Sequence, residues 1–306
     1  MNDLDSLRRA VHAVLGLRHL ADHPAELATL VYLAVYACGD PGPIAPLRYR
    51  RLRSLLVDTV FVRRLFRAVP HSVPSAGWIL REASPVGARV EGHGVRALFP
   101  DADATLATAR PGDRVELPVP ALSLGLSPGF VVRRTREDLP DAIGRLYLNL
   151  RPRDASWALG PLARSLEREA PVVLKVLAHP AAYRRRDSCV VYVPAEPAAT
   201  LVGRIRNELE THGISLAEGI PALTGRIAPG IGYADGLDDL GSPSESYGRW
   251  VAALLVGAAR TERTVEAMVE EVGRQVSAAG RTPEAPFLRG GRTLADFDTL
   301  ARAGRR

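Results

Sequence analysis

The spacing of apolar residues changes along this chain, and that change constrains the fold more than any single motif does. The segments 4–15, 25–38 and 52–69 carry apolar residues at helical spacing. From about residue 78 to residue 150 the apolar runs shorten to strand length and are separated by Gly, Pro and Asp. We therefore expect a helical N-terminal layer followed by a sheet.

After residue 150 the pattern alternates between strand-like and helical segments. The predicted strands are 145–150, 171–177 and 187–193, and the predicted helices are 154–169, 198–213, 245–260 and 263–280. We expect a loop over APGIGYADG, residues 228–236, and a partly mobile tail over residues 284–306, where the pattern is weak. The predicted fold class is α+β, with a helical N-terminal layer and a mostly antiparallel sheet with flanking helices.

Composition narrows the class of protein without selecting one. The chain has 306 residues, of which 46% are hydrophobic and 24% charged, a mixture typical of globular proteins. We divide it into an N-terminal helical region over 1–70, an α+β domain over 71–260, and a C-terminal helix and tail over 261–306. A net charge of +6 favours an anionic partner, which could be nucleic acid, a membrane surface or a phosphorylated substrate.

Several classes of protein are disfavoured by the motifs that the chain lacks. Cys38 and Cys189 lie in separate apolar segments, and no His or Cys spacing suggests a metal site, so we expect neither metal nor cofactor. Charges interrupt the N-terminal segment too often for a signal peptide, which favours a cytoplasmic protein. GLSPG matches a nucleophile elbow, but Pro128 lacks the N–H that an oxyanion hole would need, so we predict a turn.

The chain contains a single lysine, Lys175, although Lys and Arg together number 40. It lies in the apolar run VVLKVLAHP, where a strand would place it on one face with Val173 and Leu177. A lysine that reaches solvent from a sheet edge is one interpretation. The other is a base, because burial and nearby cations can populate the neutral amine of Lys, whereas Arg stays charged. Both remain open on the pattern alone.

Arginines accompany polar side chains in two other segments. In RLYLNLR, a strand would place Arg145, Tyr147, Asn149 and Arg151 on one face, which suits either a solvent-facing strand or a floor that binds an anion. In YRRRDSCVVYVP an arginine triplet precedes an apolar strand, and such triplets are usually solvated. A hairpin-like return would bring this segment close to the strand that carries Lys175.

Several segments together resemble the HopA-type effector domain, first described in a plant-pathogen type III effector and also found in peptide natural-product gene clusters. The matching pieces, in the family's order, are HSVPSAGWILRE, LSPGFVV, RLYLNL, VVLKVLAHPAAY with RRDSCVVYVP, GIPALTGRIAPGIGYADG and ESYGR, over roughly residues 25–255. The chain departs from the pattern before GWILRE, where it is less Gly-rich, and at residue 225, which is Gly rather than a basic residue. The resemblance implies a fold like that of phosphothreonine lyases.

The resemblance also implies a reaction and its partners. In class V lanthipeptide and thioamitide pathways, members of this family are associated with a kinase-like protein. The implied chemistry is a two-step dehydration in which the kinase phosphorylates Ser or Thr of a ribosomal precursor peptide (RiPP) and the HopA-like lyase eliminates phosphate to leave a dehydroamino acid. The expected partners are therefore a kinase-like protein and a phosphorylated precursor peptide, with neither nucleic acid nor membrane.

The implied site accounts for the residues that stand out in the sequence. Elimination needs a base for the α-proton, stabilisation of the enolate-like carbonyl, and an acid or cation for the leaving phosphate. Lys175 is the expected base, and His179 and Tyr192 are candidate acids. The residues expected to bind phosphate or substrate are Arg145, Tyr147, Asn149, Arg185, Asp187, Thr224 and Arg226, with Asp187 positioning an arginine.

Two other functions remain open. A protein of the same fold could bind the precursor peptide or the kinase without catalysis. A basic nucleic-acid-binding protein is the second alternative, although the chain carries no recognised motif for it. Loss of phosphoric acid from a phosphopeptide would distinguish the lyase from both.

Overall fold

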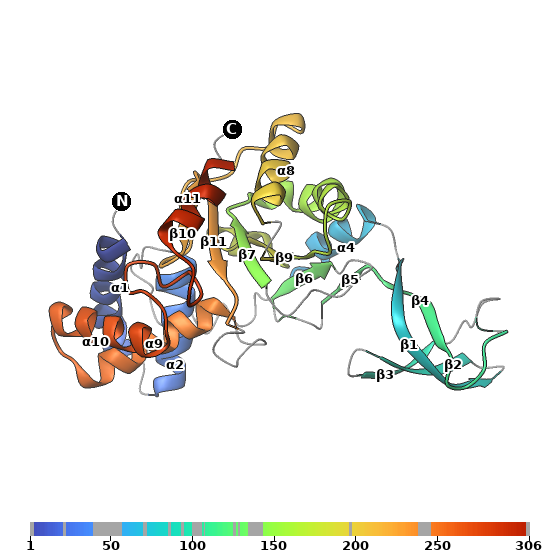
Figure 1. The fold of residues 1–306 in the computed structure, drawn as a ribbon, viewed down its shortest axis with the longest axis horizontal. Coiled ribbons are helices and arrows are strands. Elements are labelled where there is room, and N and C mark those ends of the chain that lie inside the picture. The colour runs from blue at the N-terminus through green and yellow to red at the C-terminus, as the bar shows by residue number, and fades with distance from the viewer. Residues whose placement is uncertain are drawn as a thin grey trace.

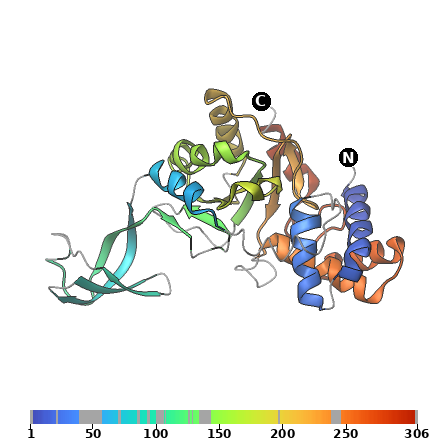
Figure 2. The ribbon, with the colours of Figure 1, turned by 180° about the vertical axis from the view of Figure 1, so that it is seen from behind.

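A computed structural model describes most of the chain. The described residues are 3–20, 23–38, 57–69, 72–84, 87–92, 95–99, 106, 108–124, 127, 129–133, 143–195, 198–237 and 246–303. Figures 1 and 2 show a body of helices packed on a sheet, with a smaller sheet projecting from one side. Within the described ranges, none of the helices combines the length and the apolar character needed to cross a bilayer.

The N-terminal helices pack against helices from the far end of the chain. They are α1 (Asp3–Leu17), the short η1 (Arg18–Leu20), α2 (Pro24–Leu30), η2 (Val31–Ala37) and α4 (Thr59–Arg67). α2 continues into η2 as a π-helix, which packs on α9 (Tyr247–Thr261), while α1 packs on α9 and α10 (Val265–Ala278). Figure 2 shows these blue and orange helices side by side. The predicted helix over 52–69 is described only from residue 57, and α4 lies within that part.

A seven-stranded sheet forms the centre of the body, with strand order β10-β11-β7-β9-β8-β6-β5. Its strands are β5 (Leu122–Ser123), β6 (Phe130–Arg133), β7 (Ile143–Leu148), β8 (Val173–Leu177), β9 (Cys189–Pro194), β10 (Gly225–Ala228) and β11 (Ile231–Asp235). Every neighbouring pair is antiparallel. The predicted α+β class, with a helical layer and a mostly antiparallel sheet, is confirmed.

Helices and short helical turns cover the rest of the body. They comprise η3 (Pro152–Asp154), α6 (Ala155–Trp157), η4 (Ala158–Leu162), α7 (Ala163–Leu166), η5 (Pro180–Arg184), α8 (Ala198–Thr211) and α11 (Leu294–Ala303). The predicted helix over 154–169 is present as the continuous helical run α6–η4–α7 over residues 155–166, in which Pro161 lies inside the π-helical η4. Because a proline cannot donate the usual helical hydrogen bond, a regular α-helix is interrupted there.

Two predictions for the last third of the chain are wrong. The segment over 228–236 was expected to be a loop, but residues 231–235 form β11, a fully buried strand inside the sheet. Its glycine content is explained by packing, because a Cβ on Gly232 would lie 3.1 Å from the hydroxyl oxygen of Thr224. The tail is also folded as far as residue 303, since Phe287 and Leu288 are buried and α11 follows them.

The register of the sheet gathers predicted site residues on one face. Lys175 and Tyr147 each lie opposite Val190, and Arg145 lies opposite Tyr192. Directly opposed residues point to the same side of a sheet, and residues two apart on one strand do so as well. The side chains of Lys175, Tyr147, Arg145 and Tyr192 therefore share one face.

The projecting sheet, here called the arm, comprises residues 72–120. It has four antiparallel strands in the order β3-β2-β1-β4: β1 (Ser72–Ser84), β2 (Gly87–Gly92), β3 (Val95–Phe99) and β4 (Arg114–Pro120). Trp78, Leu80, Val90 and Leu117 belong to a small core that is separate from the main one. The arm thus folds around its own apolar cluster beside the body (Figure 1).

Candidate functional site

A pocket opens on the face of the sheet that carries Lys175. Its empty volume, including the open mouth, is about 240 Å³. Five predicted site residues line it: Arg145, Tyr147, Lys175, Asp187 and Tyr192. The other lining residues are Tyr32, Tyr36, Val190, Ser246 and Gly248. The pocket therefore lies where β7, β8 and β9 meet the π-helix η2 and the start of α9.

The amine of Lys175 lies over two aromatic rings, one of which, Tyr192, lines the pocket. Its Nζ lies 4.6 Å from the centroid of the Phe130 ring and 5.2 Å from that of Tyr192. Among the described residues it makes no hydrogen bond or ion pair. A cation over aromatic faces is attracted by the ring electrons while it gives up part of its hydration. The only amine side chain of the chain is thus held in the pocket with its nitrogen available to a ligand.

Asp187 is the acidic member of the pocket, and Arg185 neutralises it. The Arg185 guanidinium donates two hydrogen bonds to this carboxylate, from Nε at 2.8 Å and from Nη2 at 2.7 Å. Burial alone would raise the pKa of the Asp187 carboxyl, but the charge and hydrogen bonds of Arg185, with a smaller effect of Lys175, hold that pKa below its usual value. Asp187 is therefore an ionised, paired carboxylate at neutral pH.

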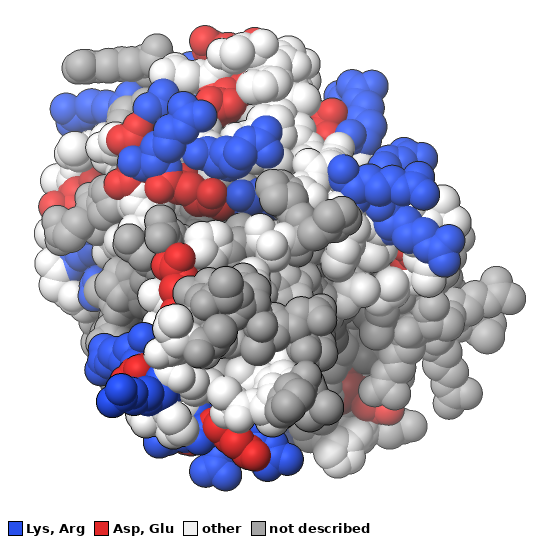
Figure 3. Space-filling view, turned by 90° about the vertical axis from the view of Figure 1, so that its right-hand side faces the viewer, with Lys and Arg blue, Asp and Glu red and all other residues white. Residues whose placement is uncertain are grey.

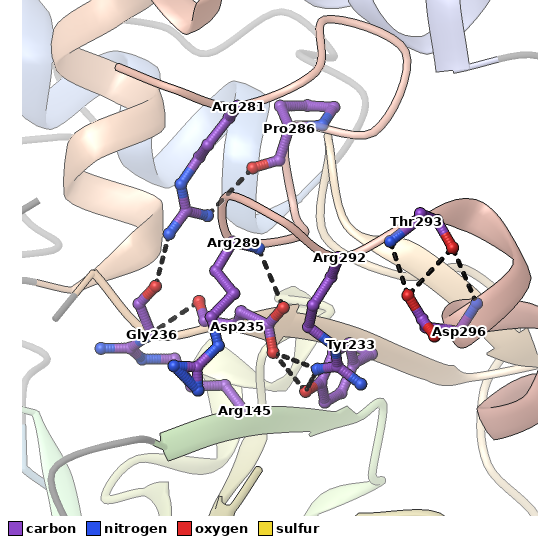
Figure 4. A network of polar contacts seen from close by, with 10 residues as sticks. All are labelled: Arg145, Tyr233, Asp235, Gly236, Arg281, Pro286, Arg289, Arg292, Thr293 and Asp296. Carbon is purple, nitrogen blue, oxygen red and sulfur yellow. Dashed lines mark hydrogen bonds and ion pairs between the residues drawn. The ribbon is translucent and has the colours of Figure 1, made fainter. Parts of the chain in front are cut away.

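The backbone of β11 holds the side chain of Arg145 in place. It is buried, its Nη1 donates to the carbonyl oxygen of Asp235 at 3.2 Å, and its guanidinium carbon lies 5.6 Å from the centroid of the Tyr192 ring. The Asp235 carboxylate is in turn held by Tyr233, Arg292 and the backbone N–H of Arg289. Figure 4 shows this network, through which the C-terminal segment supports the wall of the pocket.

A glycine at the start of α9 lets two tyrosines form the opposite wall. Tyr32 and Tyr36, one helical turn apart on η2, stack with ring centroids 5.6 Å apart and planes inclined by 15°. A Cβ on Gly248 would lie 2.3 Å from Cε1 of Tyr36 and 2.7 Å from Cε2 of Tyr32. Real Cβ atoms do not approach other atoms so closely, so only glycine fits at this contact.

The other predicted site residues do not line the pocket. Arg185 does not line the pocket, but it is paired with Asp187, which does. The remaining four have these positions: His179 caps η5 by accepting from Ala181 N, Asn149 donates to the carbonyls of Glu218 and Gly219, Thr224 donates to Pro221 O, and Arg226 is exposed on β10. Asn149 and Thr224 are buried and hold loops in place. The role of each in binding or catalysis stays a prediction.

Sequence reasoning missed five residues that line the pocket: Tyr32, Tyr36, Val190, Ser246 and Gly248. The two tyrosines occur in an apolar helical segment, where aromatic residues usually indicate core packing. The available signal was Gly248, because an isolated glycine inside a helical pattern often marks a close packing contact. Ser246 was readable as a helix N-cap, and its hydroxyl oxygen does accept a hydrogen bond from Arg249 N.

On the side that carries the arm, the described Lys and Arg side chains do not form a single basic face (Figure 3). In Figure 3, Lys and Arg atoms lie in separate groups with acidic and uncharged atoms between them. On the arm, Arg81 and Arg96 both pair with Glu91, at 3.0 and 3.5 Å. Within the part of the chain that the structure describes, no three His, Cys, Asp or Glu side chains are arranged to hold a metal ion.

Fold and pocket together define an α+β protein with a cationic, aromatic-walled site on an antiparallel sheet. The family model described as the HopA1 effector protein family matches residues 123–288, which is more than half of the chain and includes β7, β8 and β9. The chain belongs to this family. No curated protein matches the sequence.

Two solved structures share the fold across nearly the whole chain. One is the effector protein from Pseudomonas syringae pv. syringae strain 61, with 16% identity and a TM-score of 0.53, covering 94% of this chain and 98% of that one. The other is the effector protein from Pseudomonas syringae pv. tomato strain DC3000, with 15% identity and a TM-score of 0.51, covering 94% of this chain and 99% of that one. At these identities the likeness concerns the fold.

Proposed function

We propose that this protein is a lyase that eliminates phosphate from phosphoserine or phosphothreonine in a ribosomal precursor peptide. The observation that carries the proposal is the position of Lys175. The only lysine of the chain lies in a pocket, without a hydrogen bond or ion pair to any described residue, beside Arg145. A lysine that acts as a base needs such a site, because arginine cannot readily lose its proton.

The charge of the pocket suits a phosphoryl group. Lys175 and Arg145 contribute two positive charges, while Asp187 and Arg185 cancel each other. A phosphorylated Ser or Thr carries about −1.5 to −2 at neutral pH. The start of α9 adds the positive end of a helix dipole, since Ser246 and Gly248 line the same pocket. These charges favour a doubly negative ligand over a neutral one.

Residues of the pocket can accept the proton and stabilise the leaving group of this reaction. The neutral amine of Lys175 takes the α-proton of the phosphorylated residue, and the electrons of that C–H bond form the Cα=Cβ double bond. The Cβ–O bond breaks, and its electrons leave with the phosphate, which Arg145 stabilises electrostatically. Tyr192, rather than His179, is the candidate proton donor that lies in the pocket. The products are a dehydroamino acid and inorganic phosphate.

The phosphorylated substrate requires a kinase, so a kinase-like partner and the precursor peptide are part of the proposal. The test supplies a synthetic phosphoserine precursor peptide and follows loss of phosphoric acid by mass spectrometry and release of inorganic phosphate. The unphosphorylated peptide is the control. We expect elimination by the wild-type chain, with or without the kinase. If the peptide bound but no elimination occurred both with and without the kinase, the result would instead favour a non-catalytic scaffold.

A further inference from the structure

The proposed base and a carboxylate line the same pocket, and a direct contact between them would oppose the proposed reaction. A base must be free of its proton to act, and an adjacent carboxylate favours the protonated amine. Asp187 and Lys175 both line the pocket, yet no ion pair joins them. Something must therefore hold the carboxylate of Asp187 in another direction.

Two side chains hold that carboxylate. Arg185 binds both of its oxygens, and the hydroxyl of Tyr32 donates to Oδ2 at 3.3 Å. The same hydroxyl oxygen accepts a hydrogen bond from Nη2 of Arg185 at 3.1 Å, and the guanidinium lies 5.3 Å from the centroid of the Tyr32 ring. Burial and the charge of Asp187 raise the pKa of the Tyr32 hydroxyl, so it keeps the proton that it donates. Tyr32, Asp187 and Arg185 thus form one hydrogen-bonded cluster.

The ring of Tyr32 is itself fixed by packing. It stacks on Tyr36, which is buried, and the absence of a Cβ on Gly248 leaves room for both rings. The π-helical winding of η2 sets the position of the two tyrosines, and π-helical turns often occur at functional sites. The hydroxyl of Tyr32 therefore reaches the ion pair from a rigid support.

We propose that Tyr32 is a positioning residue that keeps the carboxylate of Asp187 on Arg185 and away from Lys175. The proposal rests on the role given to Lys175 above. Without the Tyr32 hydroxyl, the carboxylate of Asp187 keeps only its hydrogen bonds to Arg185. It is then freer to turn towards Lys175. The N-terminal helical layer lies outside residues 123–288, the span that the family model matches. Through Tyr32, this N-terminal layer would take part in the function of the site.

Other groups around Lys175 and Asp187 set the background for this effect. The charged and titratable side chains near them in the described ranges are Arg145 and Tyr147 on β7, Tyr192 on β9, Tyr36 on η2, and Cys38 after η2. Burial raises the pKa of the hydroxyls of Tyr36 and Tyr147 and of the thiol of Cys38. All three groups stay neutral near pH 7. A change in the charge close to Lys175 at that pH therefore comes from Asp187 and not from them.

The single lysine allows a test that needs no substrate. The full chain is treated with an acylating amine reagent across a pH series, and modification of the peptide that contains Lys175 is measured by mass spectrometry. The reagent attacks only the neutral amine, so the rate follows the fraction of Lys175 without its proton. In Tyr32→Phe we expect the profile to move to higher pH by about half a unit, which lowers the rate at neutral pH about threefold.

Tyr183→Phe is the matched control, because it also removes one tyrosine hydroxyl that donates a hydrogen bond. That hydroxyl donates to the carbonyl of Leu177 at 3.0 Å and lies outside the pocket. We expect the control to lower the melting temperature about as much as Tyr32→Phe does and to leave the labelling profile where it is in the wild type. This comparison separates a loss of stability from a change at Lys175.

The inference and the lyase proposal fail in different ways. A labelling profile that is the same in Tyr32→Phe and in the wild type would overturn the positioning role, whatever the chain catalyses. A shifted profile in a chain that eliminates nothing would support the positioning role and refute the lyase. If the chain is a lyase, we expect the acidic limb of its rate–pH profile to shift by the same amount in Tyr32→Phe, with little change in KM.

Discussion

Lys175 is subject to opposing electrostatic effects. Its Nζ lies over the rings of Phe130 and Tyr192, contacts worth about 0.5–2 kcal/mol each, and the guanidinium of Arg145 lies in the same pocket. A free carboxylate at close range would have a larger effect than either ring, because a single opposite charge within 4–6 Å shifts a protonation equilibrium by about 1–3 pH units. The pairing of Asp187 with Arg185 therefore matters more to the amine than either ring does.

Lys175→Arg separates charge from basicity. The substitution keeps a cation in the pocket but removes a group that can accept a proton near neutral pH. We expect binding of a phosphoserine peptide, measured by calorimetry, to stay within about threefold of the wild type, and elimination to fall about a hundredfold or more. Normal elimination by Lys175→Arg would show that another residue is the base.

Asp187→Asn tests the buried ion pair. The substitution leaves the Arg185 guanidinium, whose side chain is 15% exposed, without its counter-charge, and we expect a loss of about 3 kcal/mol or more in unfolding free energy. The native pKa of Asp187 is lowered, so the wild-type pair stabilises fully above the unfolded value of about 4 and loses that contribution as the pH falls through the native value.

Denaturant unfolding between about pH 2 and pH 7 measures both effects of Asp187→Asn. The variant should be less stable at neutral pH and should show a smaller loss of stability on acidification than the wild type. Equal slopes of unfolding free energy against pH in the two proteins would mean that Asp187 does not contribute to the acid dependence.

The contact between η2 and α9 depends on one missing methyl group. Glycine inside a helix usually costs about 0.5–1 kcal/mol relative to alanine, so Gly248→Ala would stabilise an isolated α9. Here the new Cβ would lie 2.3 Å from Tyr36, whose side chain is buried and cannot move aside. We expect the clash to win and the variant to lose about 1–3 kcal/mol of unfolding free energy.

Gly257→Ala, on the same helix, is the matched control for Gly248→Ala. A Cβ on Gly257 would have its nearest neighbour, Oε1 of Gln275, at 3.6 Å, an ordinary van der Waals contact. We expect this variant to be as stable as the wild type or up to about 1 kcal/mol more stable. Thermal melts of both variants measure the difference, and a stable Gly248→Ala would show that the tyrosine wall is not tightly packed.

Strand period was enough to predict one wall of the site. Arg145 and Tyr147 alternate with leucines, and Lys175 lies in an apolar run, so their facing could be read from the sequence. The return of the chain from β8 to β9 was predicted as well, which put Asp187 near the lysine strand. These predictions succeeded because they depend on local periodicity and on a short connection.

The tyrosine wall and β11 could not be read in the same way. Tyr32 is far from Asp187 along the chain, and no local pattern states which helix covers which face of a sheet. The segment that contains β11 was predicted to be a loop because its glycines resemble those of a nucleotide-binding loop, whereas in the fold Gly230 lies in the turn before β11 and Gly232 packs closely against Thr224. The missed features thus depend on contacts between distant segments.

The body and the arm have separate apolar cores. The main core runs from α1 through the central sheet to α11 and includes none of the described residues of the arm. The C-terminal segment belongs to the body, because Arg292 and the backbone of Arg289 bind the carboxylate of Asp235 on β11. Sequence position is therefore a poor guide to which parts support the pocket: both ends of the chain do, and the arm between them has its own core.

Removal of the arm tests this division. Val73 on β1 lies opposite Val119 on β4, and paired residues of antiparallel strands have Cα atoms only about 4.5–5.5 Å apart. A two-residue Asn-Gly turn can therefore replace residues 74–118. Because the main core loses no member, we expect the shortened chain to unfold cooperatively, with its melting temperature within about 5 °C of the wild type. Labelling of Lys175 should keep the wild-type pH profile, whereas an altered profile or a non-cooperative melt would show that the arm supports the pocket.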